Sequence, residues 1–177
     1  MLNFRTDLAS ERRDIYQKVQ GTEGKLNGIE SQKEQINEKL SVERVKITNE
    51  EGEKAIGKPK GIYTTIDIKN LKIAQEEEIN KASEVLAKEL GDIISMHIDK
   101  QGEILVVGLG NESVTPDALG PKTINEIEVT RHFINYMPQY VKEGTRMVSA
   151  ISPGVLGTTG IETVEILKGV VENTKPK

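Results

Sequence analysis

The sequence contains no cysteine and no tryptophan, and its aromatic residues are two phenylalanines and four tyrosines. Without cysteine the chain has no disulfide, no thiolate nucleophile and no thiolate metal site. So few aromatic rings argue against the base-stacking surfaces that hold single-stranded nucleic acid. A net charge of −4 also lacks the basic surface of a protein that binds nucleic acid or an anionic membrane. We therefore expect neither nucleic acid nor membrane as a partner.

Long apolar runs are missing too. No run approaches the roughly 18 apolar residues that indicate a membrane span, and the N-terminal stretch MLNFRTDLASERR has no apolar centre of a secretory signal. These absences predict a soluble, cytoplasmic protein. A length of 177 residues, with 36% hydrophobic residues and 16 glycines, suits one domain or one domain with a smaller appendage.

Charge is unevenly distributed along the chain, and its density falls by almost half after residue 100. We therefore expect a buried sheet and the functional site in the second part. The expected elements of the first part are solvated helix or loop over 11–41, antiparallel strands over 42–48 and 62–68 around a turn-rich stretch 49–61, and a helix over 75–90 closed by Gly91.

The second part repeats the pattern of strand, glycine-rich loop and helix. The expected elements are a buried strand over 104–109, a helix from Pro121 with Ile134 on its apolar side, a second buried strand over 147–151, the loop 152–160, and a helix from about Ile161. This order predicts an α/β fold with a parallel or mixed sheet and helices on both faces, beside an N-terminal antiparallel strand pair. Binding and chemistry then belong at the carboxyl ends of the strands.

Asp117 is the candidate catalytic group, because it lies in the glycine-rich loop after the first buried strand. A carboxylate in this position can act as acid or base on water; the alternative is that it only begins a helix or an Asx turn. Other chemistries lack their motifs: no phosphate-loop or dinucleotide fingerprint is present, and Ser152 is not flanked by the glycines of a serine elbow. His97 and His132 have no metal-binding spacing, so we expect no metal and no cofactor.

Several longer segments together resemble one family. They are ILVVGLGNESVTPDALGPKT, VTRHF, RMVSAISPGVLGTTGIET and ENTKP, with RTDLA and GKPKGIYTTIDI nearer the N-terminus. The family is the germination protease of spore-forming bacteria, which degrades small acid-soluble spore proteins during germination. The resemblance implies a fold like that of hydrogenase-maturation proteases, assembly as a homotetramer, a location in the forespore or spore core, and synthesis as an inactive precursor that loses a short propeptide.

The resemblance also implies an atypical aspartic-type peptidase with two essential aspartates. The first falls on Asp117, within TPDALG, and the second would follow the next strand, beyond Lys177. Two carboxylates that share acid–base work must be held in different protonation states, and a single one has no such partner. We therefore expect this chain alone to be an N-terminal fragment with little or no activity; turnover by it would require Glu162 or Asp67 in the missing role.

The segment Asp7-Leu8-Ala9-Ser10-Glu11 resembles the sequence that this family cuts. It predicts self-cleavage between Asp7 and Leu8; the alternative is a frayed end of common residues. The predicted parts are a propeptide 1–7, a charged N-terminal part 8–100 and the start of the catalytic core 101–177. Two rival functions stay open: a non-catalytic half-enzyme that assembles or regulates, and a metal-dependent maturation-type protease on the same fold.

Overall fold

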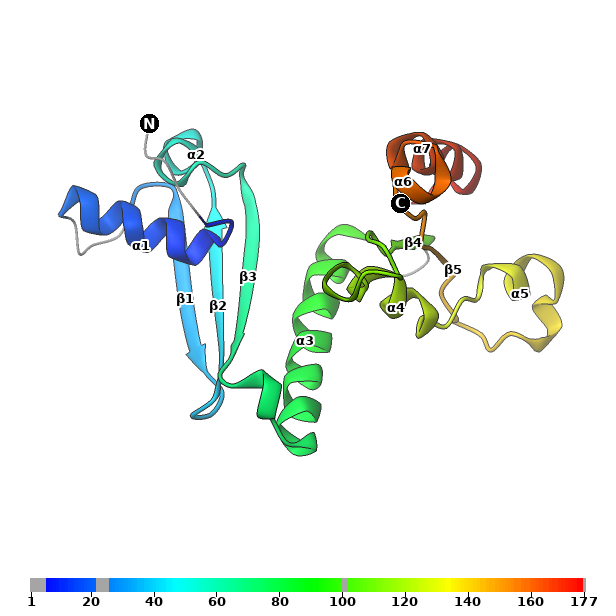
Figure 1. Cartoon of the computed structure of the whole chain (residues 1–177), viewed down its shortest axis with the longest axis horizontal. Helices are drawn as coiled ribbons and strands as arrows, with labels where there is room; N and C mark the ends of the chain where they lie inside the picture. The colour runs from blue at the N-terminus through cyan, green and yellow to red at the C-terminus, as the bar shows by residue number, and fades with distance from the viewer. Residues whose placement is uncertain (1–5, 22–25, 100–101, 177) are drawn as a thin grey trace. The chain divides into compact units, whose positions relative to one another are not determined.

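The computed structural model describes residues 6–21, 26–99 and 102–176 and divides into two compact units, Met1–Ile93 and Ile94–Lys177. Each unit is described by itself (Figure 1). The elements of the first, in chain order, are α1 (Ala9–Gln20), β1 (Ile29–Gln35), β2 (Leu40–Ile47), α2 (Glu50–Ile56), β3 (Gly61–Ile68), the 3-10 turn Leu71–Ile73 and α3 (Glu76–His97), whose last residues enter the second. Within the described residues, no helix is both long enough and apolar enough to cross a bilayer.

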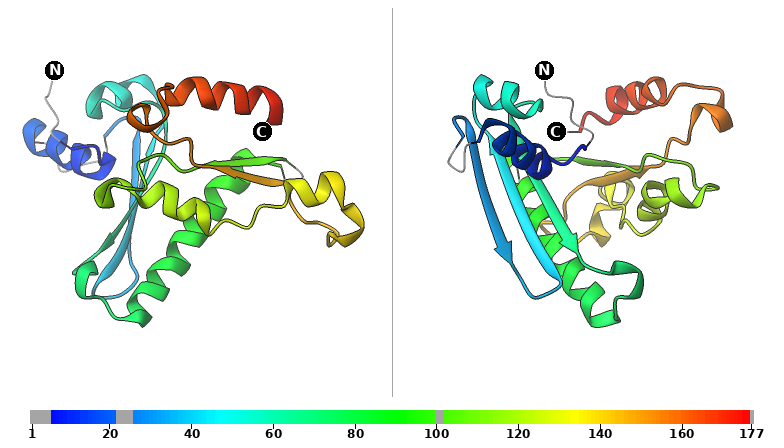
Figure 2. Two further views of the ribbon diagram at one scale, coloured as in Figure 1. Left: turned by 45° about the vertical axis from the view of Figure 1, so that its right-hand side comes forward. Right: turned by 60° about the vertical axis from the view of Figure 1, so that its left-hand side comes forward.

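The strands of the first unit form one antiparallel sheet in the order β1-β2-β3. The three strands lie side by side in Figure 1 and in the right-hand view of Figure 2. The pairing of β2 with β3 confirms the predicted antiparallel pair. The expectation of helix or loop over 11–41 is confirmed up to Gln20, where α1 ends, and is wrong for β1, which pairs with β2.

The central strand β2 has a hydrophobic core on each face, because successive side chains of a strand point to opposite sides. Val45 and Ile47 pack with Ala9 of α1 and with Ala55 and Ile56 of α2. On the other face two further β2 residues pack against α3; this second cluster is Leu40, Val42, Ala82 and Val85. The polar first unit therefore has a well-buried core, although its sequence is dense in charge.

Two local features differ from the sequence expectation. The stretch 49–61 contains helix α2, whose N-cap Asn49 accepts a hydrogen bond from the Gly52 N–H at 2.9 Å and which ends at Gly57 with φ 65°. Gly91 does not end the third helix, which continues to His97. A glycine inside a helix costs about 1 kcal/mol of stability relative to alanine. Helix α3 continues through Gly91 despite this cost.

An ion pair links β2 to α3 inside this unit. The Arg44 Nε donates to Glu89 Oε2 at 2.8 Å, and Glu89 is only 5% exposed. The bound guanidinium lowers the pKa of Glu89 below its ordinary value of 4.5, against the opposing effect of burial. Arg44 also contacts Glu34 of β1 at 3.0 Å, but the Glu34 side chain is 43% exposed.

We expect Glu89→Gln to lower the free energy of unfolding by about 2 kcal/mol at neutral pH, because it leaves the guanidinium without its buried anion. Glu34→Gln is the matched control, with an expected loss below about 0.5 kcal/mol because that pair faces water. The folded-state pKa of Glu89 is depressed, so its contribution is present above pH 4.5 and disappears as the pH falls through the lower folded value. Urea unfolding of the three proteins at neutral and acid pH measures this, and equal losses for Glu34→Gln and Glu89→Gln would contradict it.

The second unit contains a parallel pair of strands. Its elements are β4 (Ile104–Val107), the 3-10 turn Thr115–Asp117, α4 (Leu119–Asn125), α5 (Arg131–Tyr136), the 3-10 turn Pro138–Tyr140, β5 (Val148–Ile151), α6 (Leu156–Thr159) and α7 (Thr163–Thr174). Strands β4 and β5 pair in parallel from Ile104 with Val148 to Val107 with Ile151. The α/β order and the parallel pairing are therefore confirmed.

The details of this unit correct three expectations. Both strands are half-buried rather than fully buried. Pro121 is the third residue of α4, not its first. The single helix expected from Pro121 past Ile134 is two short helices, because α4 ends at Asn125 and α5 begins only at Arg131.

Candidate functional site

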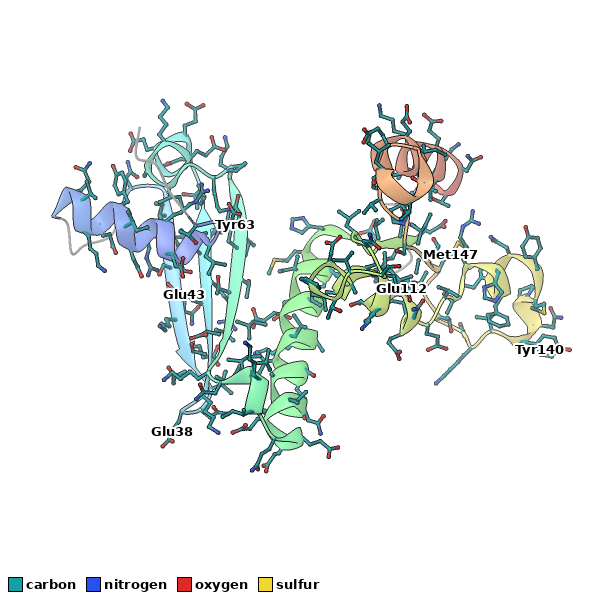
Figure 3. All side chains as sticks on the ribbon, in the orientation of Figure 1. Glu38, Glu43, Tyr63, Glu112, Tyr140 and Met147 are labelled. Carbon is teal, nitrogen blue, oxygen red and sulfur yellow. The ribbon has the colours of Figure 1, made fainter. Side chains whose placement is uncertain are left out.

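The site is built from the loop that leaves the carboxyl end of β4. This loop runs from Gly108 through Glu112, labelled in Figure 3, and closes in a 3-10 turn whose last residue is Asp117. The backbone of Gly108 still belongs to the sheet edge, since its N–H donates to the Ile151 carbonyl at 3.0 Å. Asp117 therefore lies just beyond the strand ends, where the sequence placed it.

Asn111 braces the loop from within. Its backbone N–H donates to the Asp117 carbonyl at 3.0 Å, and its carbonyl accepts from the Val114 N–H at 3.1 Å. Its side-chain Oδ1 accepts from the Ser113 N–H at 3.0 Å, which is an Asx turn. The Asp117 N–H in turn donates to the Val114 carbonyl at 2.8 Å. Both ends of the loop are thus tied together at the residue that carries the acid.

Three glycines let the backbone segments approach closely. A Cβ on Gly110, which has φ 135°, would lie 2.0 Å from the Asp117 carbonyl oxygen. A Cβ on Gly108 would lie 2.3 Å from the Gly120 carbonyl, and one on Gly120 would lie 2.1 Å from the Leu109 carbonyl. Real side chains do not tolerate such distances, so the path of this loop depends on glycine at all three positions.

Asp117 lines a cleft of about 380 Å³ between the end of β4 and α4. The other lining residues are Val106, Val107, Gly108, Leu109, Pro116, Leu119, Gly120, Thr123 and Ile124, none of them ionisable. Asp117 is exposed, and no described residue donates a hydrogen bond to its carboxylate. It does not cap α4 either, because the N-cap is Ala118 and no side chain caps that helix. The Asp117 carboxylate is therefore accessible to a ligand bound in the cleft.

The other residues singled out in the sequence lie elsewhere. Glu162 is the exposed N-cap residue of α7, and Asp67 lies exposed on β3 in the first unit. His132 is exposed beside the ring of Phe133 at a centroid distance of 4.0 Å, and His97 is the last residue of α3. Among the described residues, no group of three histidines or acids could hold a metal ion.

The motif that contains His132 has a structural role at its first two residues. The Thr130 hydroxyl accepts from the Val148 N–H at 2.9 Å and donates to the Arg146 carbonyl at 2.5 Å. The Nε of Arg131 pairs with Glu103 at 2.5 Å, just before β4. Thr130 and Arg131 therefore anchor α5 to the two strands. The sequence alone did not indicate this role of Thr130 and Arg131. For the brace at Asn111 its only signal was the frequency of asparagine in Asx turns.

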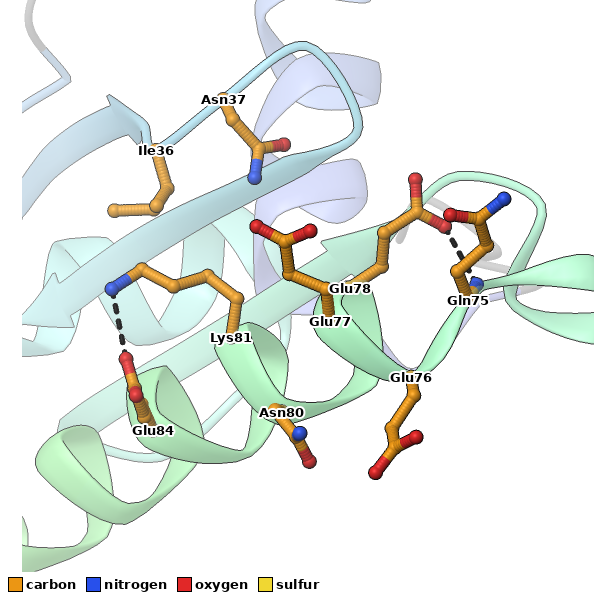
Figure 4. Close-up of a pocket in the computed structure, with 9 residues that line it drawn as sticks. All are labelled: Ile36, Asn37, Gln75, Glu76, Glu77, Glu78, Asn80, Lys81 and Glu84. Atoms are coloured by element: carbon orange, nitrogen blue, oxygen red, sulfur yellow. Dashed lines mark hydrogen bonds and ion pairs between the residues drawn. The ribbon is translucent and has the colours of Figure 1, made fainter.

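A larger hollow of about 1030 Å³ lies at the start of α3, beside Ile36 and Asn37 (Figure 4). Two of its acids, Glu78 and Glu84, have partners in or next to the helix, and Glu78 also pairs with Lys39. Glu78 accepts from the Gln75 N–H at 3.0 Å, which satisfies an amide at the helix N-terminus, and negative charge is favourable there. Glu84 pairs with Lys81 at 2.8 Å. We assign this hollow no chemistry.

The comparisons with known proteins agree on one family. A family model described as germination protease matches residues 6–177. The germination proteases of Clostridium acetobutylicum and Caldanaerobacter subterraneus are 45% and 48% identical to this chain. Each match includes 99% of this chain, but only 53% and 52% of the length of the two relatives. That of Priestia megaterium is 46% identical over 98% of the chain and 48% of its own length. The chain thus spans about half the length of the curated relatives it matches. It belongs to the germination protease family.

Proposed function

We propose that the protein is a peptidase that degrades small acid-soluble spore proteins during germination, in the forespore or spore core and as a homotetramer. The observation that carries the proposal is the placement of Asp117. Its carboxylate is exposed in an otherwise non-ionisable cleft, on a loop braced by Asn111, at the carboxyl end of a parallel strand. Membership of the germination protease family supports the assignment as a peptidase.

In this reaction Asp117 acts on water as one of two carboxylates. One carboxylate takes a proton from the water as its oxygen attacks the peptide carbonyl carbon, and the other gives a proton to the departing amide nitrogen. The products are a carboxylic acid and an amine, and the C–N bond is the one broken. The apolar lining of the cleft, which includes Leu109 and Leu119, favours an apolar side chain next to the bond that is cut.

The resemblance to the family implies that the second aspartate follows the next strand, and these 177 residues do not include it. Residues 1–177 alone are therefore expected to give no measurable turnover of a purified spore protein, whereas the full-length protein cleaves it, because a lone carboxylate cannot supply both proton transfers at once. Quantifying peptide products by mass spectrometry checks this. Robust cleavage by residues 1–177 would overturn the two-aspartate mechanism and direct mutagenesis to Glu162. Absence of cleavage by the full-length protein would favour a non-catalytic module instead.

The protein is also a precursor that activates itself by hydrolysis of the Asp7–Leu8 bond, as the likeness of this segment to the family's cleavage sequence indicates. Asp7 and Leu8 are both exposed, immediately before α1. We expect the processed protein to begin at Leu8 and the full-length Asp117→Asn variant to keep residues 1–7. N-terminal sequencing after incubation measures both, and a mature protein that begins at any other residue would reject the assignment.

A further inference from the structure

The side chain of Arg12, in α1, connects the segment before that helix to the end of α2. Its Nε donates to the Thr6 carbonyl at 2.6 Å and one of its terminal nitrogens donates to the Gly57 carbonyl at 2.9 Å. The other lies 3.4 Å from the Asp7 carboxylate. The Arg12 side chain is 16% exposed. A single, mostly buried guanidinium therefore contacts both residues that precede the Asp7–Leu8 bond.

The residues after this bond are folded away. Leu8 is the N-cap residue of α1, and its carbonyl accepts from the Arg12 N–H at 3.1 Å. Ala9 and Ser10 are only 3% and 6% exposed, and Ala9 packs in the core with residues of β2 and α2. The N–H of the bond itself donates to the Thr6 hydroxyl at 3.1 Å. A peptidase cannot contact Ala9 and Ser10 while they are helical and buried.

We propose that Arg12 is a latch: it holds the first turn of α1 closed, and hydrolysis of the Asp7–Leu8 bond requires this turn to open. The inference rests on the proposed processing at this bond. It adds that the stability of the closed turn sets the rate of this processing. Proteolysis of a folded segment proceeds through its open state, so the rate follows the population of that state. The guanidinium lowers that population because opening separates it from Thr6 and Asp7 on one side or from Gly57 on the other.

Cleavage then weakens the same turn. Water adds its hydroxyl to the Asp7 carbonyl carbon and its proton to the Leu8 nitrogen. The new carboxylic acid then gives its proton to the new amine, which leaves a carboxylate on Asp7 and a free ammonium group on Leu8. Arg12 loses its contacts with Thr6 and Asp7, and the new positive charge lies at the N-terminus of α1, where the helix dipole disfavours it. The reaction removes part of what held the closed turn, and this opposes a return to the precursor arrangement.

The test compares Arg12→Ala, Arg12→Lys and the control Lys18→Ala in the full-length protein. Lys18 is an exposed cation in the last turn of the same helix. Two rates are measured: loss of residues 1–7 by intact mass, and hydrogen exchange of the backbone amides at positions 12 and 13. We expect Arg12→Ala to raise both rates roughly tenfold, since it removes charged hydrogen bonds. We expect Arg12→Lys to give a smaller increase and Lys18→Ala to match the parent.

The outcomes separate the latch from the processing on which it rests. Faster exchange in Arg12→Ala with unchanged processing shows that opening does not limit cleavage, and it overturns the inference while the processing stands. Unchanged exchange overturns the inference directly. Faster exchange with no new terminus at Leu8 in any variant overturns the proposed processing and leaves Arg12 as a purely structural clamp. Arg12→Lys keeps the positive charge, so it provides a result even where Arg12→Ala fails to fold.

Discussion

Replacing Asp117 by asparagine in the full-length protein is expected to lower kcat for a small acid-soluble spore protein by about a thousandfold. The amide has nearly the same shape as the carboxylate but cannot take a proton from water or return one, and positioned acid–base catalysis contributes roughly 10² to 10⁴ in rate. The substitution leaves the apolar lining of the cleft unchanged, so KM should change little.

The loop itself should survive the change, because the structure holds Asp117 through its backbone N–H and carbonyl, not through its carboxylate. The thermal midpoint of Asp117→Asn is therefore expected to match the parent. Glu112→Gln is the control: this exposed acid lies on the same loop but does not line the cleft. It should retain activity within about twofold. Undiminished digestion by Asp117→Asn, measured as initial rates, would remove Asp117 from the mechanism.

The parts of the fold that the sequence predicts are those whose patterns are local. Residues 104–107 form a continuous β-branched and apolar run, and 62–68 alternate, so each indicates a strand without knowledge of its neighbours. The repeated order of strand, loop and helix then implies the parallel pairing of β4 with β5. The position of Asp117 follows from the same logic, because it lies in the loop that follows β4.

The elements that sequence reasoning missed depend on tertiary contacts. Strand β1, with the sequence IESQKEQ, buries only its first residue, Ile29, well and shows no apolar alternation. Its strand conformation comes from the hydrogen bonds with β2. Helix α2 contains Gly52, which reads as a turn signal in the sequence. In the structure a Cβ there would lie 2.5 Å from the Gly28 carbonyl, so the glycine serves a close approach between segments.

Within the candidate site, the acid was predictable and its support was not. The hydrogen bond between Asn111 and Asp117 closes a loop whose path is set by contacts between glycines and distant carbonyls. Spacing in a sequence cannot show which carbonyl a glycine will face. Gly110 has a positive φ, which glycine adopts readily and other residues rarely adopt. Only the structure shows that the space where a Cβ would lie is occupied by the carbonyl oxygen of Asp117.

Gly110→Ala is accordingly expected to lower kcat at least a hundredfold, although residue 110 carries no chemistry. The new methyl group would lie 2.0 Å from the Asp117 carbonyl oxygen and would require an L side chain at φ 135°. The loop must move by more than 1 Å to relieve the contact, and a displacement of about that size at a reacting group costs on the order of 10² in rate. Strain at this position should also lower the free energy of unfolding by about 1–3 kcal/mol.

Gly169→Ala is the matched control for an added methyl group, because Gly169 lies inside α7 and, apart from the nearby backbone of that helix, no atom of the described residues is within 4 Å of the position of its Cβ. This variant should keep full activity and gain roughly 0.5–1 kcal/mol of stability from the better helix propensity of alanine. Initial rates and urea unfolding of both variants provide the comparison. If Gly110→Ala were as active as Gly169→Ala, the close approach of Gly110 to Asp117 would not be needed to place the carboxylate, and the braced loop could not be the element that positions it.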